Sequence, residues 1–226
     1  GSGMKTFLWR FLVPYGALRT IRNGLVAIVF SATAAAAAPV TVAALGDSLT
    51  AGYGLAQDEG FVPQMQAWLT EHGAEVTLLN AGVSGDTTAG GLSRIDWTLT
   101  PDVDGMLLAL GGNDYLRGVD PKASRANLDA ILSKAEADTV PVMLIGLQAG
   151  NNYGPDYAEA FKAMYGDLSV SHNVPLYPDW FAGLRDVGLQ GYLQADGIHP
   201  NAAGVKLIVA AMGPSVLEFI DSLPER

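Results

Sequence analysis

The feature that most constrains the fold is a regular alternation of strand-like and helix-like stretches that starts near residue 40. Residues 40–45 form a continuous apolar run, which is typical of a parallel strand buried on both faces. We predict strands at residues 40–45, 75–80, 105–110, 141–147 and 174–177. Helices are predicted at residues 61–72, 88–99, 121–137, 156–172 and 201–222. This alternation indicates an α/β protein with a parallel sheet covered by helices on both faces.

The N-terminal segment, residues 1–38, differs from the rest in composition. Residues 1–3 precede the first methionine, Met4, and are interpreted as a cloning remnant. Basic residues without any acidic residue are followed by an apolar run over residues 24–38, which ends in small residues. This layout is typical of a secretory signal, so we predict cleavage after Ala37 or Ala38 and a single periplasmic or secreted domain at residues 39–226. A retained membrane anchor is the alternative, but the run is short for a span of about 20 residues, and no stable membrane attachment is expected after cleavage.

Charge and composition exclude several kinds of site. The chain has no cysteine, which excludes disulfides, thiolate metal sites and a cysteine nucleophile. The predicted signal holds four of the 13 basic residues and none of the 23 acidic ones, so the rest of the chain has 9 basic and 23 acidic residues, a net charge of −14. We therefore expect no nucleic-acid partner, because so acidic a domain repels a phosphate backbone.

Three loops that follow predicted strands carry candidate site residues, because ligands bind at the carboxyl ends of such strands. Ser48 follows the first strand within Gly46-Asp47-Ser48-Leu49, where glycine permits a sharp bend. Gly85 lies in a glycine-containing loop after the second strand. Asn113 follows two glycines after the third strand, and its amide can donate hydrogen bonds. Each motif alone is also consistent with a helix cap or an ordinary turn.

A fourth candidate site lies near the C-terminus, at Asp196-Gly197-Ile198-His199-Pro200. The Asp-x-x-His spacing allows the carboxylate of Asp196 to reach the imidazole of His199 and to set its tautomer. The second ring nitrogen would then be available as a general base. An aspartate at a helix start beside an unrelated surface histidine is the alternative interpretation.

Taken together and in this order, the four motifs resemble the SGNH (GDSL) hydrolase superfamily, in particular its bacterial periplasmic branch of acyl-thioesterases, lysophospholipases and arylesterases. The resemblance covers the chain from about Val40 to the last helix. It implies a flavodoxin-like three-layer α/β/α sandwich with a five-stranded parallel sheet. The chain lacks the G-x-S-x-G elbow of α/β-hydrolases, since Gly46 and Thr50 flank Ser48 at those positions.

The resemblance also implies a role for each matched residue. Ser48 would be the nucleophile, His199 the base and Asp196 its orienting acid. The N–H groups of Ser48 and Gly85 and the amide of Asn113 would form the oxyanion hole. A substrate-binding loop is implied around Asn152, Tyr153, Gly154 and Tyr157. The substrate would be a small ester or thioester, with no metal and no organic cofactor.

Three alternatives compete with this interpretation. A carbohydrate esterase, removing acetyl groups from sugars, would use the same triad; the absence of tryptophan near the motifs disfavours sugar stacking. A metal-dependent phosphoesterase would use Asp47, Asn113, Asp196 and His199, but one histidine with scattered carboxylates is a poor transition-metal site. A noncatalytic binding module on the same fold is the third, and the full set of catalytic residue types argues against it.

Overall fold

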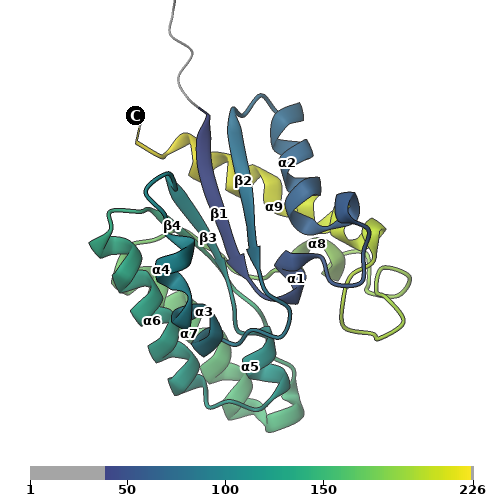
Figure 1. Cartoon of the computed structure of the whole chain (residues 1–226). Coiled ribbons are helices and arrows are strands. Elements are labelled where there is room, and N and C mark those ends of the chain that lie inside the picture. Colours follow the sequence, from purple (N-terminus) through teal and green to yellow (C-terminus); the bar gives the residue numbers. More distant parts are fainter. Residues whose placement is uncertain (1–38, 225–226) are drawn as a thin grey trace, which may run out of the picture. The chain divides into compact units, whose positions relative to one another are not determined.

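The structure is a computed structural model that describes residues 39–224, so the predicted secretory signal lies outside the described residues. Five parallel strands form one sheet in the order β2-β1-β3-β4-β5 (Figure 1). This is the flavodoxin-like order, and it confirms the predicted fold class. The strands are β1 (Val40–Gly46), β2 (Val76–Gly82), β3 (Gly105–Ala109), β4 (Val142–Ile145) and β5 (Leu176–Tyr177).

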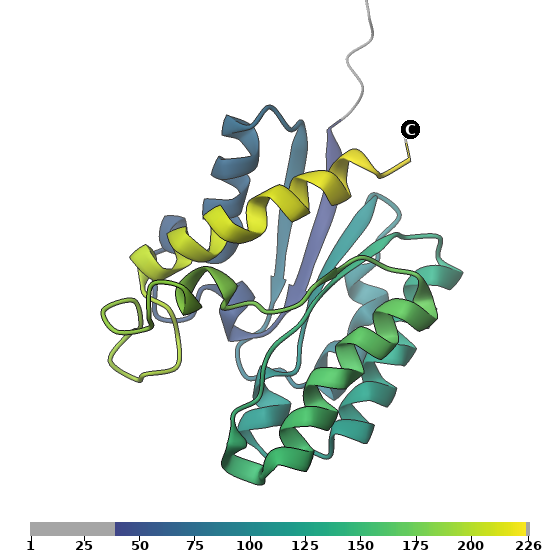
Figure 2. The same cartoon turned by 180° about the vertical axis from the view of Figure 1, so that it is seen from behind.

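Helices cover both faces of the sheet. On one face α2 packs against α9, and α9 packs against α8; Figure 2 shows α9 running across the strands. On the other face α6 packs against both α3 and α7. The bounds on the first face are α2 (Phe61–Glu71), α8 (Ala182–Arg185) and α9 (Ala202–Asp221). Those on the second are α3 (Thr88–Ser93), α4 (Ile95–Thr98), α6 (Pro121–Ala137) and α7 (Pro155–His172).

The core lies between these layers, and the burial of each strand follows its place in the sheet. All residues of β3 and β4 are buried, whereas the edge strand β2 alternates between buried and exposed positions at its start. Helix α9 is long and apolar enough to cross a membrane, but half of its most apolar window is buried within the domain. Its Phe219, together with Leu223 just after the helix, lies against Gly105 at the start of β3, as expected of a core helix.

Apart from shifts of one or two residues at the ends of elements, the structure differs from the predicted elements in three details. The single helix predicted at 88–99 is interrupted at Arg94, which ends α3 and precedes α4. Strand β5 has only two residues because Pro175 and Pro178 flank it, and proline has no N–H to donate to a strand. Short helices at turns were not predicted: α8, and also α1 (Ser48–Ala51), η1 (Gln57–Glu59), α5 (Gly112–Leu116) and η2 (Asn151–Tyr153).

The topology determines where a site can form. The chain leaves β1 toward β2 and then returns to the other side of β1 to form β3, so the strand order reverses between β1 and β3. The loops at the carboxyl ends of these two strands separate there and leave a crevice between them. These are the loops that carry Ser48 and Asn113.

Candidate active site

The turn after β1 places Ser48 at the first position of α1. Asp47 caps this helix, since its Oδ1 accepts a hydrogen bond from the N–H of Leu49 at 3.0 Å. Gly46 has no room for a side chain, because a Cβ atom there would lie 1.9 Å from Oγ1 of Thr50. Only glycine therefore fits at the end of the strand, and the turn that follows leaves Ser48 half-buried at the carboxyl edge of the sheet.

The structure brings Ser48, His199 and Asp196 together in series. Nε2 of His199 lies 2.8 Å from Oγ of Ser48, and Nδ1 lies 2.7 Å from Oδ2 of Asp196. The other carboxylate oxygen of Asp196 accepts the N–H groups of His199 and Ile198 at 3.0 and 2.9 Å. The hydrogen bond from the His199 side chain, followed by these two backbone bonds, lowers the pKa of Asp196 to about 2. The carboxylate is thus ionised at neutral pH, beside the imidazole.

The residues predicted for the oxyanion hole line the same pocket as Ser48. Gly85 lies in the loop after β2 with a φ of +87°, and Asn113 lies in α5, after β3. Nδ2 of Asn113 donates to the carbonyl oxygen of Asp86 at 2.9 Å and lies 3.4 Å from Oδ2 of Asp47. Among residues 39–224 the backbone N–H groups of Ser48 and Gly85 have no hydrogen-bond acceptor. Both groups can therefore donate to a bound molecule.

Asp47 is a buried carboxyl group at the base of this site. It is 2% exposed, and burial raises its pKa to about 6, with smaller increases from the charges of Asp114 and Asp86. The hydrogen bond from Leu49 and the nearby His199 act in the opposite direction. The proton of Asp47 is therefore lost near pH 6 in the folded protein.

Arg94, at the break between α3 and α4, joins the loops that hold the site. Its Nη2 and Nη1 donate to the carbonyl oxygens of Gly46 at 2.9 Å and Ala81 at 2.8 Å, near the ends of β1 and β2. Its Nε lies 2.6 Å from Oδ2 of Asp86, whose carbonyl oxygen holds Asn113. The guanidinium therefore binds three points around the loops of Ser48, Gly85 and Asn113.

A second buried acid, Asp114, anchors the helix that carries Asn113. Its two oxygens accept hydrogen bonds from the N–H of Thr88 at 2.8 Å, the hydroxyl of Thr88 at 2.6 Å and the hydroxyl of Ser124 at 2.8 Å. Helix α5 is thereby attached to α3 and α6. The amide of Asn113 is thus presented from a buried support and not from a free loop.

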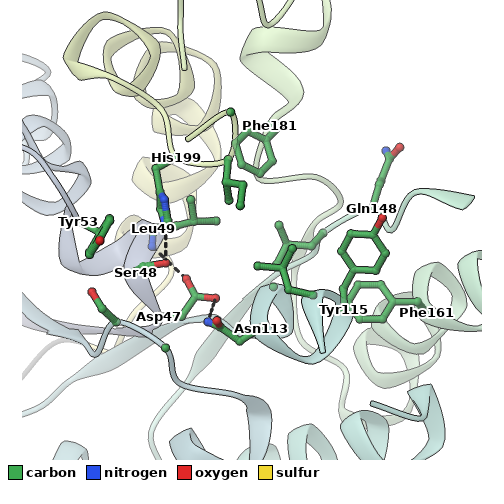
Figure 3. A pocket seen from close by; sticks show the side chains of 17 residues that line it. Asp47, Ser48, Leu49, Tyr53, Asn113, Tyr115, Gln148, Phe161, Phe181 and His199 are labelled. Atoms are coloured by element: carbon green, nitrogen blue, oxygen red, sulfur yellow. Dashed lines mark hydrogen bonds between the residues drawn. The ribbon is translucent and has the colours of Figure 1, made fainter. Parts of the chain in front are cut away.

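A pocket of about 340 Å³ opens beside Ser48, a volume suited to a small-molecule ligand. Ser48, Asn113 and His199 lie at one end of it, and the remaining wall is largely apolar and aromatic (Figure 3). That wall was not predicted from the sequence, because it is assembled from residues of several helices and loops that lie far apart in sequence. Its larger members are Leu49, Tyr53, Tyr115, Leu116, Leu147, Gln148, Phe161, Phe181 and Ile198.

The four residues predicted to bind substrate are not among the residues that line this pocket, and their role stays a prediction. Tyr153 and Tyr157 pack against each other with ring centroids 5.0 Å apart, and against Tyr115 at 6.1 and 6.4 Å. The hydroxyl of Tyr157 donates to the carbonyl oxygen of Val119 at 2.8 Å. Tyr115, which follows β3, therefore stands between these tyrosines and the pocket. Asn152 and Gly154 belong to the same loop and do not line the pocket either.

The donor geometry does not fit the metal-dependent phosphoesterase. Both ring nitrogens of His199 are engaged, one by Ser48 and one by Asp196. The described residues contain no group of three or more His, Cys, Asp or Glu side chains arranged to hold a metal ion. Asp47 and Asp196 each use an oxygen to cap a backbone turn.

A serine, a histidine and an aspartate in hydrogen-bonded series at the carboxyl edge of a parallel sheet are the arrangement of an α/β serine hydrolase. The sequence profile of the GDSL-like lipase/acylhydrolase family matches residues 44–207. The chain therefore belongs to this family, which confirms the resemblance seen in its motifs.

Individual relatives agree with this assignment. The chain is 37% identical over 195 residues to esterase TesA of Pseudomonas aeruginosa, an alignment that covers 86% of this chain and 95% of the relative. It is 36% identical over 169 residues to thioesterase 1/protease 1/lysophospholipase L1 of Escherichia coli strain K12, covering 74% and 78% of the two chains. The crystal structure of AlinE4, an SGNH-hydrolase family esterase, superposes with a TM-score of 0.66 at 38% identity, covering 80% of this chain and 96% of the other.

Proposed function

We propose that the protein hydrolyses carboxylic esters and thioesters through an acyl-enzyme formed on Ser48. The observation that carries the proposal is the hydrogen-bonded series from Ser48 through His199 to Asp196, at 2.8 and 2.7 Å, beside a largely apolar pocket. The names of the relatives, esterase and thioesterase/lysophospholipase, support the same substrate classes.

In the proposed mechanism Nε2 of His199 takes the proton of Ser48 as Oγ attacks the acyl carbonyl carbon. Asp196, ionised at neutral pH, holds the Nδ1 proton and so keeps Nε2 available as the base. The protonated imidazole then gives its proton to the departing alcohol or thiol. Water repeats the same steps to release the acyl group. These steps require no metal or organic cofactor.

The negative oxygen of the tetrahedral intermediate would accept three hydrogen bonds, from the N–H groups of Ser48 and Gly85 and from Nδ2 of Asn113. One hydrogen of Nδ2 is directed to Asp86. The other has only a long contact of 3.4 Å with Oδ2 of Asp47, which an oxyanion at about 2.9 Å would outcompete. Preorganised donors of this kind supply a large part of the rate acceleration in acyl transfer.

The apolar wall favours acyl or aryl groups over the carbohydrate-esterase alternative. Tyr115, Phe161 and Phe181 present aromatic rings to the pocket, and among residues 39–224 no tryptophan lines it. We further propose that the enzyme acts in the periplasm or is secreted after loss of residues 1–37 or 1–38; the basic and then apolar pattern of that segment supports export.

The experiment that tests the proposal compares p-nitrophenyl esters, an acyl-CoA, a lysophospholipid and an acetylated sugar as substrates of the purified domain. Ser48→Ala and His199→Ala should each remove most of the activity while the melting temperature stays near that of the wild type. A fluorophosphonate should modify Ser48, located by peptide mass spectrometry. Ser171→Ala, at an exposed serine of α7, is the control. Near-normal turnover by Ser48→Ala would overturn the proposal, and a preference for the acetylated sugar would favour the carbohydrate esterase.

A further inference from the structure

The loop that carries Asp196 and His199 is largely exposed, so core packing does little to determine its position. Residues 195–198 are all exposed. An antiparallel bridge between Leu193 and Pro200 closes the loop at its base. The N–H of Gln194 donates to the carbonyl oxygen of His199 at 2.7 Å, and its carbonyl oxygen accepts from Gly197 at 3.0 Å. These bonds shape the loop internally but do not attach it to Ser48.

The side-chain amide of Gln194 makes that attachment. Its Nε2 donates to the carbonyl oxygen of Pro200 at 3.0 Å, within the loop, and to the carbonyl oxygen of Tyr53 at 2.8 Å. Tyr53 belongs to the turn that ends α1, and its own N–H donates to the carbonyl oxygen of Ser48 at 3.0 Å. Two hydrogen bonds therefore connect Gln194 to the backbone of Ser48, and the first of them joins residues that are 141 positions apart in sequence.

The turn at Tyr53 is shaped to receive this amide. The next residue is Gly54, where a Cβ atom would lie 2.2 Å from Oε1 of Gln194, so a side chain at that position would displace the amide. On the same turn the ring of Tyr53 contacts the imidazole of His199, with centroids 4.7 Å apart. The carbonyl oxygens of Tyr53 and Pro200 each accept one hydrogen of the Gln194 amide, so both of its N–H donors are used.

We propose that Gln194 is a positioning residue, which keeps the imidazole of His199 within hydrogen-bonding distance of Ser48 by joining the two loops. The inference rests on the proposed function, since it assigns Gln194 a part in proton transfer between these residues. Displacements of about 1 Å between reacting groups can lower a rate by about 100-fold. Loss of the bridge should therefore lower the rate of acylation without changing how the pocket binds substrate.

A second glutamine provides a matched control. Nε2 of Gln64 also bridges two carbonyl oxygens, those of Glu59 at 2.7 Å and Ala202 at 3.1 Å. Ala202 lies 138 residues after Gln64 in sequence. It joins η1 and the start of α2 to α9 and touches none of the residues of the candidate triad. Gln64→Met and Gln194→Met thus remove the same kind of bridge with a side chain of similar length and no charge.

The experiment measures kcat and KM for a p-nitrophenyl ester, the rate constant for fluorophosphonate modification of Ser48, and the melting temperature. We expect both variants to melt a few degrees below the wild type. Gln194→Met should lower kcat about 10- to 100-fold with KM changed less than about twofold, and should slow phosphonylation by a similar factor. Gln64→Met should leave these rates within about twofold of the wild type. Gln194→Glu keeps the shape of the side chain but presents a carboxylate to two carbonyl oxygens, so its kcat should also be lower than that of the wild type. This variant replaces Gln194→Met in the experiment if Gln194→Met does not fold.

A kcat within about twofold of the wild type in a folded Gln194 variant, or a loss confined to KM, would overturn the inference and leave the proposed function standing. Ser48→Ala is measured in the same series to separate the two. Turnover retained by Ser48→Ala would overturn the proposed function, and the assignment of Gln194 with it.

Discussion

Replacing Asp47 by asparagine should stabilise the protein at alkaline pH and have a smaller effect in acid. Burial raises the pKa of Asp47 from 3.8 to about 6, so the folded protein retains a proton that the unfolded chain releases between these pH values. The free energy of unfolding therefore falls as the pH rises through this window, and Asp47 contributes no further change above it. Asparagine has the same size, stays neutral, and can accept the N–H of Leu49 as a helix cap.

The size of the effect follows from the pKa shift. A difference of about two pH units corresponds to about 3 kcal/mol over the whole window, because each unit is worth about 1.4 kcal/mol. About half of this should appear between pH 5 and pH 8, since part of the window lies below pH 5. In Asp47→Asn the side-chain amide would also replace the Asp47 oxygen that lies near Nδ2 of Asn113. This replacement changes the free energy of unfolding by an amount that does not depend on pH.

The measurement is urea unfolding of wild type and Asp47→Asn at pH 5, 6, 7 and 8, followed by the fluorescence of tryptophans including the buried Trp180. The difference in unfolding free energy between the two proteins should change in favour of the variant as the pH rises. Asp58→Asn, which removes an exposed carboxylate, is the control. A difference that is constant with pH, or one that favours the variant more at pH 5 than at pH 8, would refute the reasoning.

Three further predictions concern catalysis. Asn113→Ala should lower kcat about 10²- to 10³-fold with little change in KM, because the lost donor acts on the oxyanion. A change in KM alone would instead assign Asn113 to substrate binding. The pH–rate profile should show no loss of activity from protonation of Asp196 above about pH 3, since the pKa of Asp196 is lowered from 3.8 to about 2; a loss of activity centred near pH 4 would contradict this. Tyr153→Ala should lower kcat/KM more for long-chain or aryl esters than for acetate, through loosening of Tyr115, and an equal loss on all esters would indicate a packing role.

The central part of the fold could be predicted because burial leaves a clear pattern in sequence. Strands β1, β3 and β4 are covered on both faces and are almost continuously apolar, so their runs are visible without any structure. Helices of four or five residues have no such pattern. They are formed by turn geometry and tertiary contacts, as in α1, where Gly46 and the cap at Asp47 turn the chain. The break at Arg94 has the same origin, since that side chain is drawn to carbonyl oxygens of β1 and β2.

The candidate site was predictable where its residues occur in short motifs. The Asp-x-x-His spacing places Asp196 against His199 through local bonds alone, and the strand-end rule locates Ser48 and Asn113. Arg94 and Gln194 were missed because each acts on carbonyl oxygens of distant segments, which carry no side-chain signal. The substrate-binding role of the loop at Tyr153 stays a prediction, because the sequence does not fix which side chains reach the pocket. The strand-end rule places a loop at the correct edge of the sheet but does not say which of two neighbouring loops faces the crevice.

The two halves of the site are held in different ways, and this has a consequence for how the protein loses activity. Ser48, Gly85 and Asn113 lie at strand ends that Arg94 and Asp114 attach to the buried sheet and helices. His199 and Asp196 lie on an exposed loop attached through Gln194, the hydrogen bond to Ser48 and the ring of Tyr53. Local openings cost least where few buried contacts are lost. The loop of His199 can therefore separate from Ser48 while the sheet, and the donors proposed to bind the oxyanion, stay in place.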